Sequence, residues 1–442
     1  MRKTLVALLV TLLFALGFPQ KFLEVLNPPS LVVIERSLNV SLKALENVFV
    51  TLLLNDAILE RASIEAGQTR EFRIPLDRVR NKIVFEARKN GEGQTLIFEV
   101  TYLPRVHAVV DKSFSGENGE LVDGVPHFNS VQKAIDYLRE RRNNDERLYV
   151  FVKNGDYYEK ITIDVPNLSL IGEDVYKTRL YYDLAAGVTL PDGKTVGTSG
   201  SASVTITSKA VGFTAENITF ENSFDESNPE IKSKQAVAVL TQSDRAVFKN
   251  CRFIGNQDTL YVRGGLHYFV DCYIEGDVDF IFGDGQAVFE KCTIFSVDRP
   301  GIKPKGYVTA ASTKQDKLGF LFLNCEFVSN VSEPGSVYLG RPWHPSSDPY
   351  SVNSNVVIME CYLGEHVHPD GWTSMSSKDP KTGETIWFHP ETERFFEYRN
   401  YGPGAVVNEK RPQLTTDLLD LYSKEKFLQG WDVEEFLKNL YR

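Results

Sequence analysis

Cys251-Arg252-Phe253 is an apolar–polar–apolar triplet that returns 21 residues later as Cys272-Tyr273-Ile274. The same pattern recurs as Leu168-Ser169-Leu170, Ile218-Thr219-Phe220, Cys292-Thr293-Ile294, Cys325-Glu326-Phe327 and Cys361-Tyr362-Leu363. Alternation of this kind predicts a short strand with side chains facing inward and outward in turn. A strand repeated at this period buries its apolar face only by stacking on the next copy. The sequence therefore predicts an all-β chain built as a parallel β-helix.

The spacing of the copies indicates the number and size of the coils. Phe248, Phe269 and Phe289 each stand three positions ahead of a cysteine and extend the repeat. Gaps of 33 and 36 residues between later copies predict single coils with longer loops. The gap of 50 residues from Leu168 to Ile218 predicts two coils.

All five cysteines occupy the first position of this triplet. We expect them to point into the solenoid as small buried hydrophobes, without disulfides, metal ligation or catalysis. His366 and His368 flank one valine and could share a metal, but without cysteines or carboxylates around them a plain loop is the favoured interpretation.

The chain has 442 residues, 42% hydrophobic and 24% charged, which is typical of a soluble globular protein with a large core. Its net charge of −10 disfavours nucleic acid as a partner. Arg2 and Lys3 precede an apolar run from Leu5 to Leu16, which predicts a signal peptide over residues 1–17 and a secreted, periplasmic or cell-surface location. An uncleaved anchor is the alternative, although the run is short for a spanning helix. After cleavage we expect no stable membrane partner.

The chain is expected to divide near Pro104. Residues 18–103 show β-rich alternation without the triplet, which predicts a small β-sandwich-like accessory domain, either a spacer or a carbohydrate-binding module. Residues 104–442 hold the β-helix. Ser130 is a candidate N-cap of a helix that closes the first end, and Asp432 caps a C-terminal helical segment expected to cover the far end.

Two aspartates, Asp258 and Asp279, share the 21-residue interval, each lying seven positions after its cysteine. We therefore expect their carboxylates to be neighbours one coil apart. Two carboxylates this close in a partly desolvated groove do not both ionise easily, which predicts one acid and one nucleophile or base. The spacing leaves open which is which.

Polar groups of two kinds accompany this pair. Gln257 precedes Asp258, and Gln235 opens the preceding coil; their amides can donate to a developing oxyanion without adding charge. Arg341 offers a guanidinium fork that holds one aspartate ionised, beside the aromatic ring of Trp343.

These segments resemble the signature motifs of the pectin methylesterase family. Five of them match in the family's order: Gly155–Glu159, Gln235–Val239, Gln257–Leu260, Asp279–Gly283 and Leu339–Trp343. The resemblance runs from about Val106 to Arg411 and includes Asn400–Ala405. It is of the bacterial type, because plant members often carry a helical inhibitor-like pro-region that the β-patterned N-terminal segment does not resemble.

The resemblance implies a right-handed parallel β-helix that hydrolyses the methyl esters of galacturonate units in pectin, releasing methanol without metal or organic cofactor. Carried onto this sequence, it makes Asp279 the nucleophile and Asp258 the general acid that then becomes the base. Gln235 and Gln257 would stabilise the oxyanion, and Arg341 would hydrogen-bond the nucleophile.

The resemblance also implies substrate contacts. Trp343 would stack on a sugar ring. On the residues alone, Tyr261 and Phe282 are expected to bind substrate along the groove, with the core as the alternative place for a phenylalanine of this strand. Many members have Ser-Ala-Thr where this chain has Ser201-Ala202-Ser203, so the substrate-contacting hydroxyl is expected from Ser203 or from Thr205.

Three further residues receive other expectations. Asp284 adds a third carboxylate, expected near the cleft and able to shift the pKa of the acid. Tyr157 and Glu159 are expected to support the fold rather than touch substrate.

Three other functions remain open on the residues alone. A polygalacturonase would need carboxylates roughly 6.5–9.5 Å apart, wider than one coil step. A pectate lyase would need a calcium site of clustered carboxylates. A non-catalytic polysaccharide-binding solenoid is the third alternative, and the sequence predicts no oligomeric state.

Overall fold

The computed structural model describes residues 21–30, 32–76 and 78–441. The expected signal peptide, residues 1–17, lies outside them. The chain forms two compact units, one reaching to Arg105 and the other spanning Val106–Leu440.

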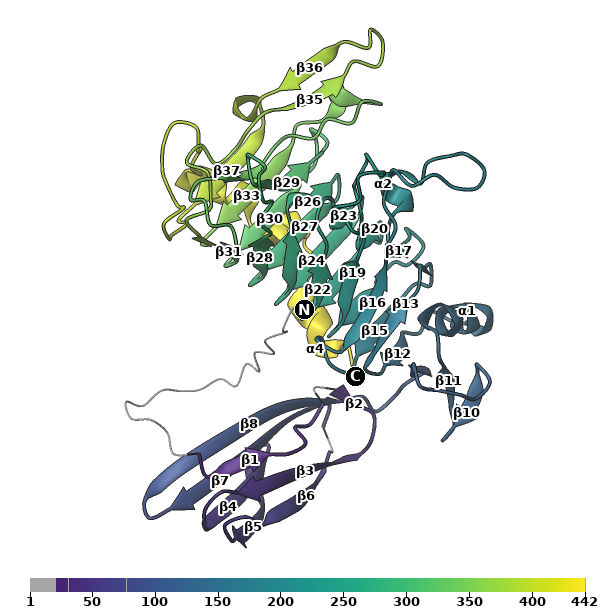
Figure 1. The fold of residues 1–442 in the computed structure, drawn as a ribbon, viewed down its shortest axis with the longest axis vertical. Helices are drawn as coiled ribbons and strands as arrows, with labels where there is room; N and C mark the ends of the chain where they lie inside the picture. The colour runs from purple at the N-terminus through teal and green to yellow at the C-terminus, as the bar shows by residue number, and fades with distance from the viewer. Residues whose placement is uncertain (1–20, 31, 77, 442) are drawn as a thin grey trace. The chain divides into compact units, whose positions relative to one another are not determined.

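The N-terminal unit is a β-sandwich of two sheets around one core (Figure 1). One sheet has the order β1 (Leu23–Val25), β3 (Ser37–Ala44), β6 (Thr69–Pro75). The other has the order β2 (Val32–Val33), β8 (Glu92–Tyr102), β7 (Arg80–Lys89), β4 (Val48–Leu54), β5 (Ala57–Ile64). Alternate residues such as Val40 and Leu42 of β3 face Val50 and Leu52 of β4 in the shared core.

The second unit is a parallel β-helix with three long sheets, so the predicted fold class is confirmed (Figure 1). The twelve-stranded sheet has the order β10 (Glu120–Val122), β11 (Val125–Phe128), β9 (Ala108–Val110), β12 (Leu148–Val152), β15 (Leu168–Gly172), β18 (Thr214–Glu216), β21 (Ala246–Lys249), β24 (Leu266–Val270), β27 (Gln286–Glu290), β30 (Phe320–Leu323), β33 (Asn355–Met359), β37 (Arg394–Tyr398). The eight-stranded sheet has the order β13 (Gly155–Tyr158), β16 (Thr178–Tyr182), β19 (Thr219–Asn222), β22 (Arg252–Ile254), β25 (Tyr273–Gly276), β28 (Thr293–Ser296), β31 (Glu326–Ser329), β34 (Tyr362–Leu363). The seven-stranded sheet has the order β14 (Ile161–Ile163), β17 (Val204–Ile206), β20 (Val239–Thr241), β23 (Leu260–Val262), β26 (Val278–Gly283), β29 (Gly306–Ala311), β32 (Val337–Gly340).

The repeat of the sequence marks a corner between two of these sheets. The phenylalanine lies on the twelve-stranded sheet and the triplet on the eight-stranded sheet, so each copy spans two strands. The residue between them has a left-handed backbone, with φ of 48° at Asn250 and 54° at Asp271. Asn and Asp tolerate this conformation better than most residues, which explains the polar position before the cysteine.

The phenylalanines of successive coils stack inside the solenoid. Ring centroids are 4.8 Å apart for Phe248 and Phe269, 4.7 Å for Phe269 and Phe289, and 4.6 Å for Phe289 and Phe322, close to the spacing of neighbouring strands. All five cysteines are buried and free, which confirms that they act as small core residues.

One copy of the repeat is not equivalent to the others, because it lies in a different sheet. Leu168-Ser169-Leu170 lies in β15 of the twelve-stranded sheet, whereas Ile218-Thr219-Phe220 enters β19 of the eight-stranded sheet. The true predecessor of Phe220 is Leu180, its partner in β16, 40 residues earlier. The expected two coils are therefore wrong. One coil with a long loop, which includes α2 (Gly197–Gly200), joins these strands.

The first end of the solenoid carries the predicted helix, α1 (Val131–Arg141). Ser130 caps it by accepting a hydrogen bond from the Lys133 amide at 3.3 Å. The carboxylate of Glu159 accepts bonds from the Ser130 hydroxyl at 2.8 Å and from the Val131 amide at 3.0 Å. Tyr157 is fully buried, so both residues support the fold as expected.

The C-terminal segment does not cover the far end, and that expectation is wrong. It forms a 3₁₀ turn (Thr416–Tyr422), α3 (Lys424–Phe427) and α4 (Val433–Asn439), with Asp432 capping α4. Phe427 and Val433 pack on the outer face of the twelve-stranded sheet, against residues such as Tyr268 and Val288. The segment ends beside the first coils, where the Tyr149 hydroxyl of β12 donates to the Leu440 carbonyl (Figure 1).

Candidate active site

The two aspartates lie on successive coils of the seven-stranded sheet. Leu260 of β23 pairs with Ile281 of β26, and the same register aligns Asp258 with Asp279. The Asp258 amide donates to the Val278 carbonyl at 3.0 Å, which ties the two coils together at this point. Strands of one sheet lie about 4.8 Å apart, so the two carboxylates are neighbours.

Both aspartates have a left-handed backbone, with φ of 67° at Asp258 and 51° at Asp279. At Asp279 the pairing of β26 with β29 is also interrupted by a bulge between Val278 and Ile281. Bulges re-aim side chains and are frequent beside active sites. The irregularity therefore distinguishes this rung from the regular rungs before it.

Arg341 holds Asp279 with a two-pronged hydrogen bond. Its Nε donates to Oδ1 at 2.8 Å and its Nη2 to Oδ2 at 2.7 Å. The guanidinium also lies 3.9 Å from the ring centroid of Tyr307, which fixes its plane. Charge-assisted forks of this kind are among the strong hydrogen bonds of proteins, and this one binds both oxygens of Asp279 to the positive charge of Arg341.

Asp258 is arranged in the opposite way. It is 7% exposed, and burial, together with the charge of Asp279 and of Asp277, raises its pKa well above the ordinary value although Arg341 opposes the shift. Asp258 therefore keeps its proton to higher pH than a normal aspartate does. The pair thus combines an aspartate bound by arginine with a buried aspartate whose pKa is raised.

The two aspartates open into a cleft of about 660 Å³. Gln235, Gln257 and Arg341 line it together with both aspartates. The side-chain carbonyl oxygen of Gln235 is buried and has no hydrogen-bond partner among the described residues. The structure thus brings all five expected catalytic residues to one cavity.

An aromatic wall stands beside these polar groups. Tyr261 and Phe282, on neighbouring strands, stack with ring centroids 4.1 Å apart. The ring centroid of Trp343 lies 5.7 Å from that of Phe282 and 6.1 Å from that of Tyr261. All three residues line the cleft, as expected from the sequence.

Ser203 and Thr205 are not brought to the cleft. Ser203 is fully buried, and its hydroxyl accepts a hydrogen bond from the Tyr182 amide at 3.2 Å. Thr205 of β17 occupies the same position in its strand as Tyr261 in β23, but β17 lies two strands before β23 in the sheet. The hydroxyls that line the cleft on this side belong to Thr198 and Ser199 of α2.

The segment α2 is a part of the site that the sequence did not reveal. It lies in the long loop of its coil, where no periodic pattern marks a strand or helix. The Lys160 ammonium fixes it by donating to the carbonyls of Gly200 at 2.6 Å and Ala202 at 2.7 Å. The sequence of α2 does not predict a part of the site, because a Gly-Thr-Ser-Gly stretch is typical of any turn.

The third carboxylate that acts on Asp258 is Asp277, and the expectation for Asp284 is wrong. Asp284 is half-exposed; it accepts from the Gly264 amide at 3.3 Å and lies 4.0 Å from Arg263 Nε. Asp277 is 3% exposed and lies 3.4 Å from Arg299 Nε. It contributes to the raised pKa of Asp258, whereas Asp284 does not.

Asp277 belongs to a second carboxyl pair. Burial and the charge of Asp277 raise the pKa of Glu226 to about 7, and the two side chains are hydrogen-bonded. The Glu226 carboxyl group also accepts a hydrogen bond from the backbone N–H of Gln257 at 3.2 Å. This pair therefore supports the backbone from which Gln257 and Asp258 project.

No metal cluster is apparent in the part of the chain that the structure describes, counting groups of at least three His, Cys, Asp or Glu residues. His368 stacks on Tyr338 at 4.1 Å and shares a hydrogen bond with its hydroxyl at 3.2 Å, whereas His366 is buried. Within the same described residues, no helix has the length and apolar character needed to cross a membrane.

Comparison with known proteins agrees with this geometry. The family model described as Pectinesterase matches residues 121–437. Pectinesterase A of Dickeya dadantii is 41% identical over 307 residues, covering 64% of this chain and 82% of that enzyme. Pectinesterase 31 of Arabidopsis thaliana is 41% identical over 306 residues, covering 66% and 84%.

Solved structures give the same result. The pectin methylesterase of Erwinia chrysanthemi superimposes with a TM-score of 0.67 at 36% identity, covering 74% of this chain and 98% of that chain. A pectin methylesterase solved in complex with a hexasaccharide gives 0.67 at 37% identity, with the same coverage. The chain belongs to the pectinesterase family, and it is a carboxylic ester hydrolase that demethylates pectin.

Proposed function

We propose that Asp279 is the nucleophile of this pectinesterase and Asp258 its acid and base. The observation that carries the proposal is the fork between Arg341 and Asp279 beside a buried Asp258 with a raised pKa. The fork keeps a lone pair of Asp279 available while the neighbouring acid is protonated. Those are the two states that covalent catalysis by a carboxylate requires.

In the first step an oxygen of Asp279 attacks the ester carbonyl carbon of a methylated galacturonate unit. The carbonyl oxygen becomes an oxyanion, which accepts hydrogen bonds from the side-chain amides of Gln235 and Gln257. As the oxyanion collapses, the bond to methoxide breaks, and Asp258 gives its proton to the departing oxygen. The products of this step are methanol and an anhydride between Asp279 and the sugar carboxyl group.

In the second step Asp258, now a carboxylate, takes a proton from water. The hydroxide attacks the sugar carbonyl of the anhydride, and Asp279 leaves as the carboxylate that Arg341 stabilises. The product leaves as galacturonic acid, which gives its proton to the solvent, and both aspartates regain their starting protonation. No covalent bond is made or broken outside the substrate, water and the two carboxyl groups.

Substrate positioning is proposed for the aromatic wall. Trp343, Tyr261 and Phe282 present flat faces on which sugar rings pack. Methyl-esterified units are uncharged, so they suit a cleft in an acidic chain of net charge −10 better than polygalacturonate does.

The decisive experiment follows three products from methylated pectin: methanol, reducing ends and unsaturated sugar. We expect methanol alone, and its loss in Asp279→Ala with the thermal unfolding profile retained. Substantial methanol release by Asp279→Ala would refute the assignment of the nucleophile. New reducing ends or unsaturated product would instead indicate a depolymerase.

We also propose that residues 1–17 direct export and that the sandwich of residues 18–103 is a spacer. The basis is the charged and apolar pattern at the start of the sequence, together with the separate core of the sandwich. N-terminal sequencing of exported protein would test the first statement, and unchanged pectin affinity after deletion of the sandwich would support the second.

A further inference from the structure

A smaller cavity of about 210 Å³ adjoins the catalytic cleft. The two cavities share the side chains of Trp343 and Met375, so a sugar chain that crosses Trp343 leads from one into the other. The outer wall of the smaller cavity is a hairpin of β35 (Met375–Lys378) and β36 (Thr385–Phe388).

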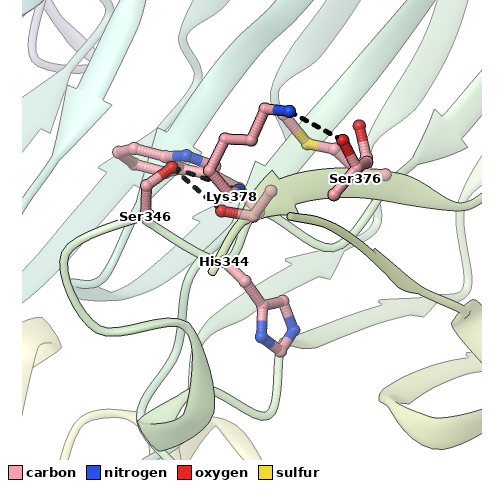
Figure 2. A pocket seen from close by; sticks show the side chains of 8 residues that line it. His344, Ser346, Ser376 and Lys378 are labelled. Carbon is pink, nitrogen blue, oxygen red and sulfur yellow. Dashed lines mark hydrogen bonds between the residues drawn. The ribbon is translucent and has the colours of Figure 1, made fainter. Parts of the chain in front are cut away.

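Lys378 contributes a positive charge to the lining of this cavity (Figure 2). Its ammonium donates to the Thr385 hydroxyl at 2.8 Å and, among the described residues, has no ion pair. The other basic residue in the lining, His344, is occupied elsewhere: Nδ1 lies 2.6 Å from the Pro349 carbonyl and Nε2 lies 3.0 Å from Glu393. In Figure 2 its ring points away from Lys378 and Ser346.

Lys378 also differs from the cation of the main cleft in having no carboxylate partner among the described residues. In the main cleft the guanidinium of Arg341 is neutralised by the fork with Asp279. Of the described side chains that line either cavity, Lys378 is therefore the one cation without a carboxylate partner. Ser346 and Ser377 also line the smaller cavity, and their hydroxyls are hydrogen-bonded to each other at 3.1 Å, which leaves one of the two free to donate to a ligand.

We propose that this cavity binds the free carboxylate of a de-esterified galacturonate unit in the chain whose methylated unit lies at Asp279. The ammonium pairs with the carboxylate, and the serine hydroxyl that is not donating to the other serine donates to it. A methyl ester at that position gains no ion pair, so the cavity favours pectin that is already partly de-esterified. The inference rests on the proposed function and adds a specificity site to it.

The test compares Lys378→Gln with wild type on fully methyl-esterified pectin and on partly de-esterified pectin. We expect KM to rise about two- to fivefold on the partly de-esterified substrate alone, the range for a partly exposed ion pair. The rise should shrink in high salt, which screens the pair. Lys378→Arg should restore the wild-type KM.

Lys381→Gln is the matched control, because this exposed lysine belongs to the same hairpin but does not line the cavity. Equal effects of Lys378→Gln on both substrates, or no effect on either, would overturn the inference. A second readout does not require turnover. In an Asp279→Ala background, Lys378→Gln should weaken binding of de-esterified oligogalacturonate by the same factor, and unchanged binding would also overturn it. Wild type that releases no methanol from either substrate would contradict the proposed function instead.

Discussion

Replacing Arg341 by lysine tests whether the geometry of the fork, beyond its charge, supports catalysis. Arg341 makes two bonds to Asp279, at 2.8 Å and 2.7 Å, in a site where the Asp279 side chain is 8% exposed. Lysine keeps the charge but replaces the fork by a single point contact. A hydrogen bond to a charged group contributes about 1.5–3 kcal/mol, and each 1.36 kcal/mol is tenfold in rate. We therefore expect kcat to fall about 10- to 150-fold.

Arg341→Met removes the charge as well, which leaves Asp279 buried without a partner. Breaking a buried ion pair costs about 3–5 kcal/mol, which corresponds to a loss of about 150- to 5,000-fold. Initial rates of methanol release give the values, and thermal unfolding verifies that each variant is folded. Arg245→Lys, an exposed arginine outside the cleft, is the control. If Arg341→Lys kept wild-type kcat, the fork would have no role beyond charge, and the reasoning would be refuted.

Three further predictions concern the acid, its support and the core. Asp258→Asn should slow both methanol release and hydrolysis of the acyl-enzyme, measured as the burst and the steady rate in stopped-flow; a variant as fast as wild type would exclude the acid role. The pKa of Glu226 is raised from 4.5 to about 7, so the folded state binds the proton of Glu226 more tightly than the unfolded state does. This proton therefore stabilises the fold fully below about pH 4.5, and the contribution is lost as pH rises through about 7. Glu226→Gln should therefore flatten the fall in Tm between those pH values, and an unchanged slope would count against the carboxyl pair. Phe269→Ala removes one of the two inner rings of the internal stack and should lower the free energy of unfolding by about 3–5 kcal/mol in urea titrations; a loss below about 1 kcal/mol would show that the stack contributes little.

The sequence predicted the solenoid and the catalytic rung because both follow from spacing. A fixed interval between Cys251 and Cys272 has to become one coil, and the same interval between Asp258 and Asp279 then places them in register. The same repeat placed the cysteines, because all five occupy the first position of the triplet, which must face the core.

The errors arise where a local pattern fits several environments. An apolar triplet suits any of the three sheets, so Leu168 was assigned to the wrong one. An amphipathic helix has the same sequence pattern whether it covers the end of a solenoid or packs along its side. The pattern therefore could not show that α4 lies along the twelve-stranded sheet. Asp277 and Asp284 stand just before and just after β26, and only the structure shows that Asp277 is buried while Asp284 is turned toward Gly264 and Arg263.

The route of the C-terminal segment has a consequence for biogenesis. A stack of coils can in principle form progressively as the chain emerges, each rung templating the next. Here Phe427 and Val433 cover apolar side chains that project outward from several middle rungs, and Leu440 reaches back to Tyr149 near the beginning. During synthesis these outward-facing apolar side chains stay exposed to water until residues 416–440 have been made and have packed on them. The segment thus completes the fold after the catalytic rung has formed, and a variant without residues 416–440 should be prone to aggregate although its catalytic rung is intact.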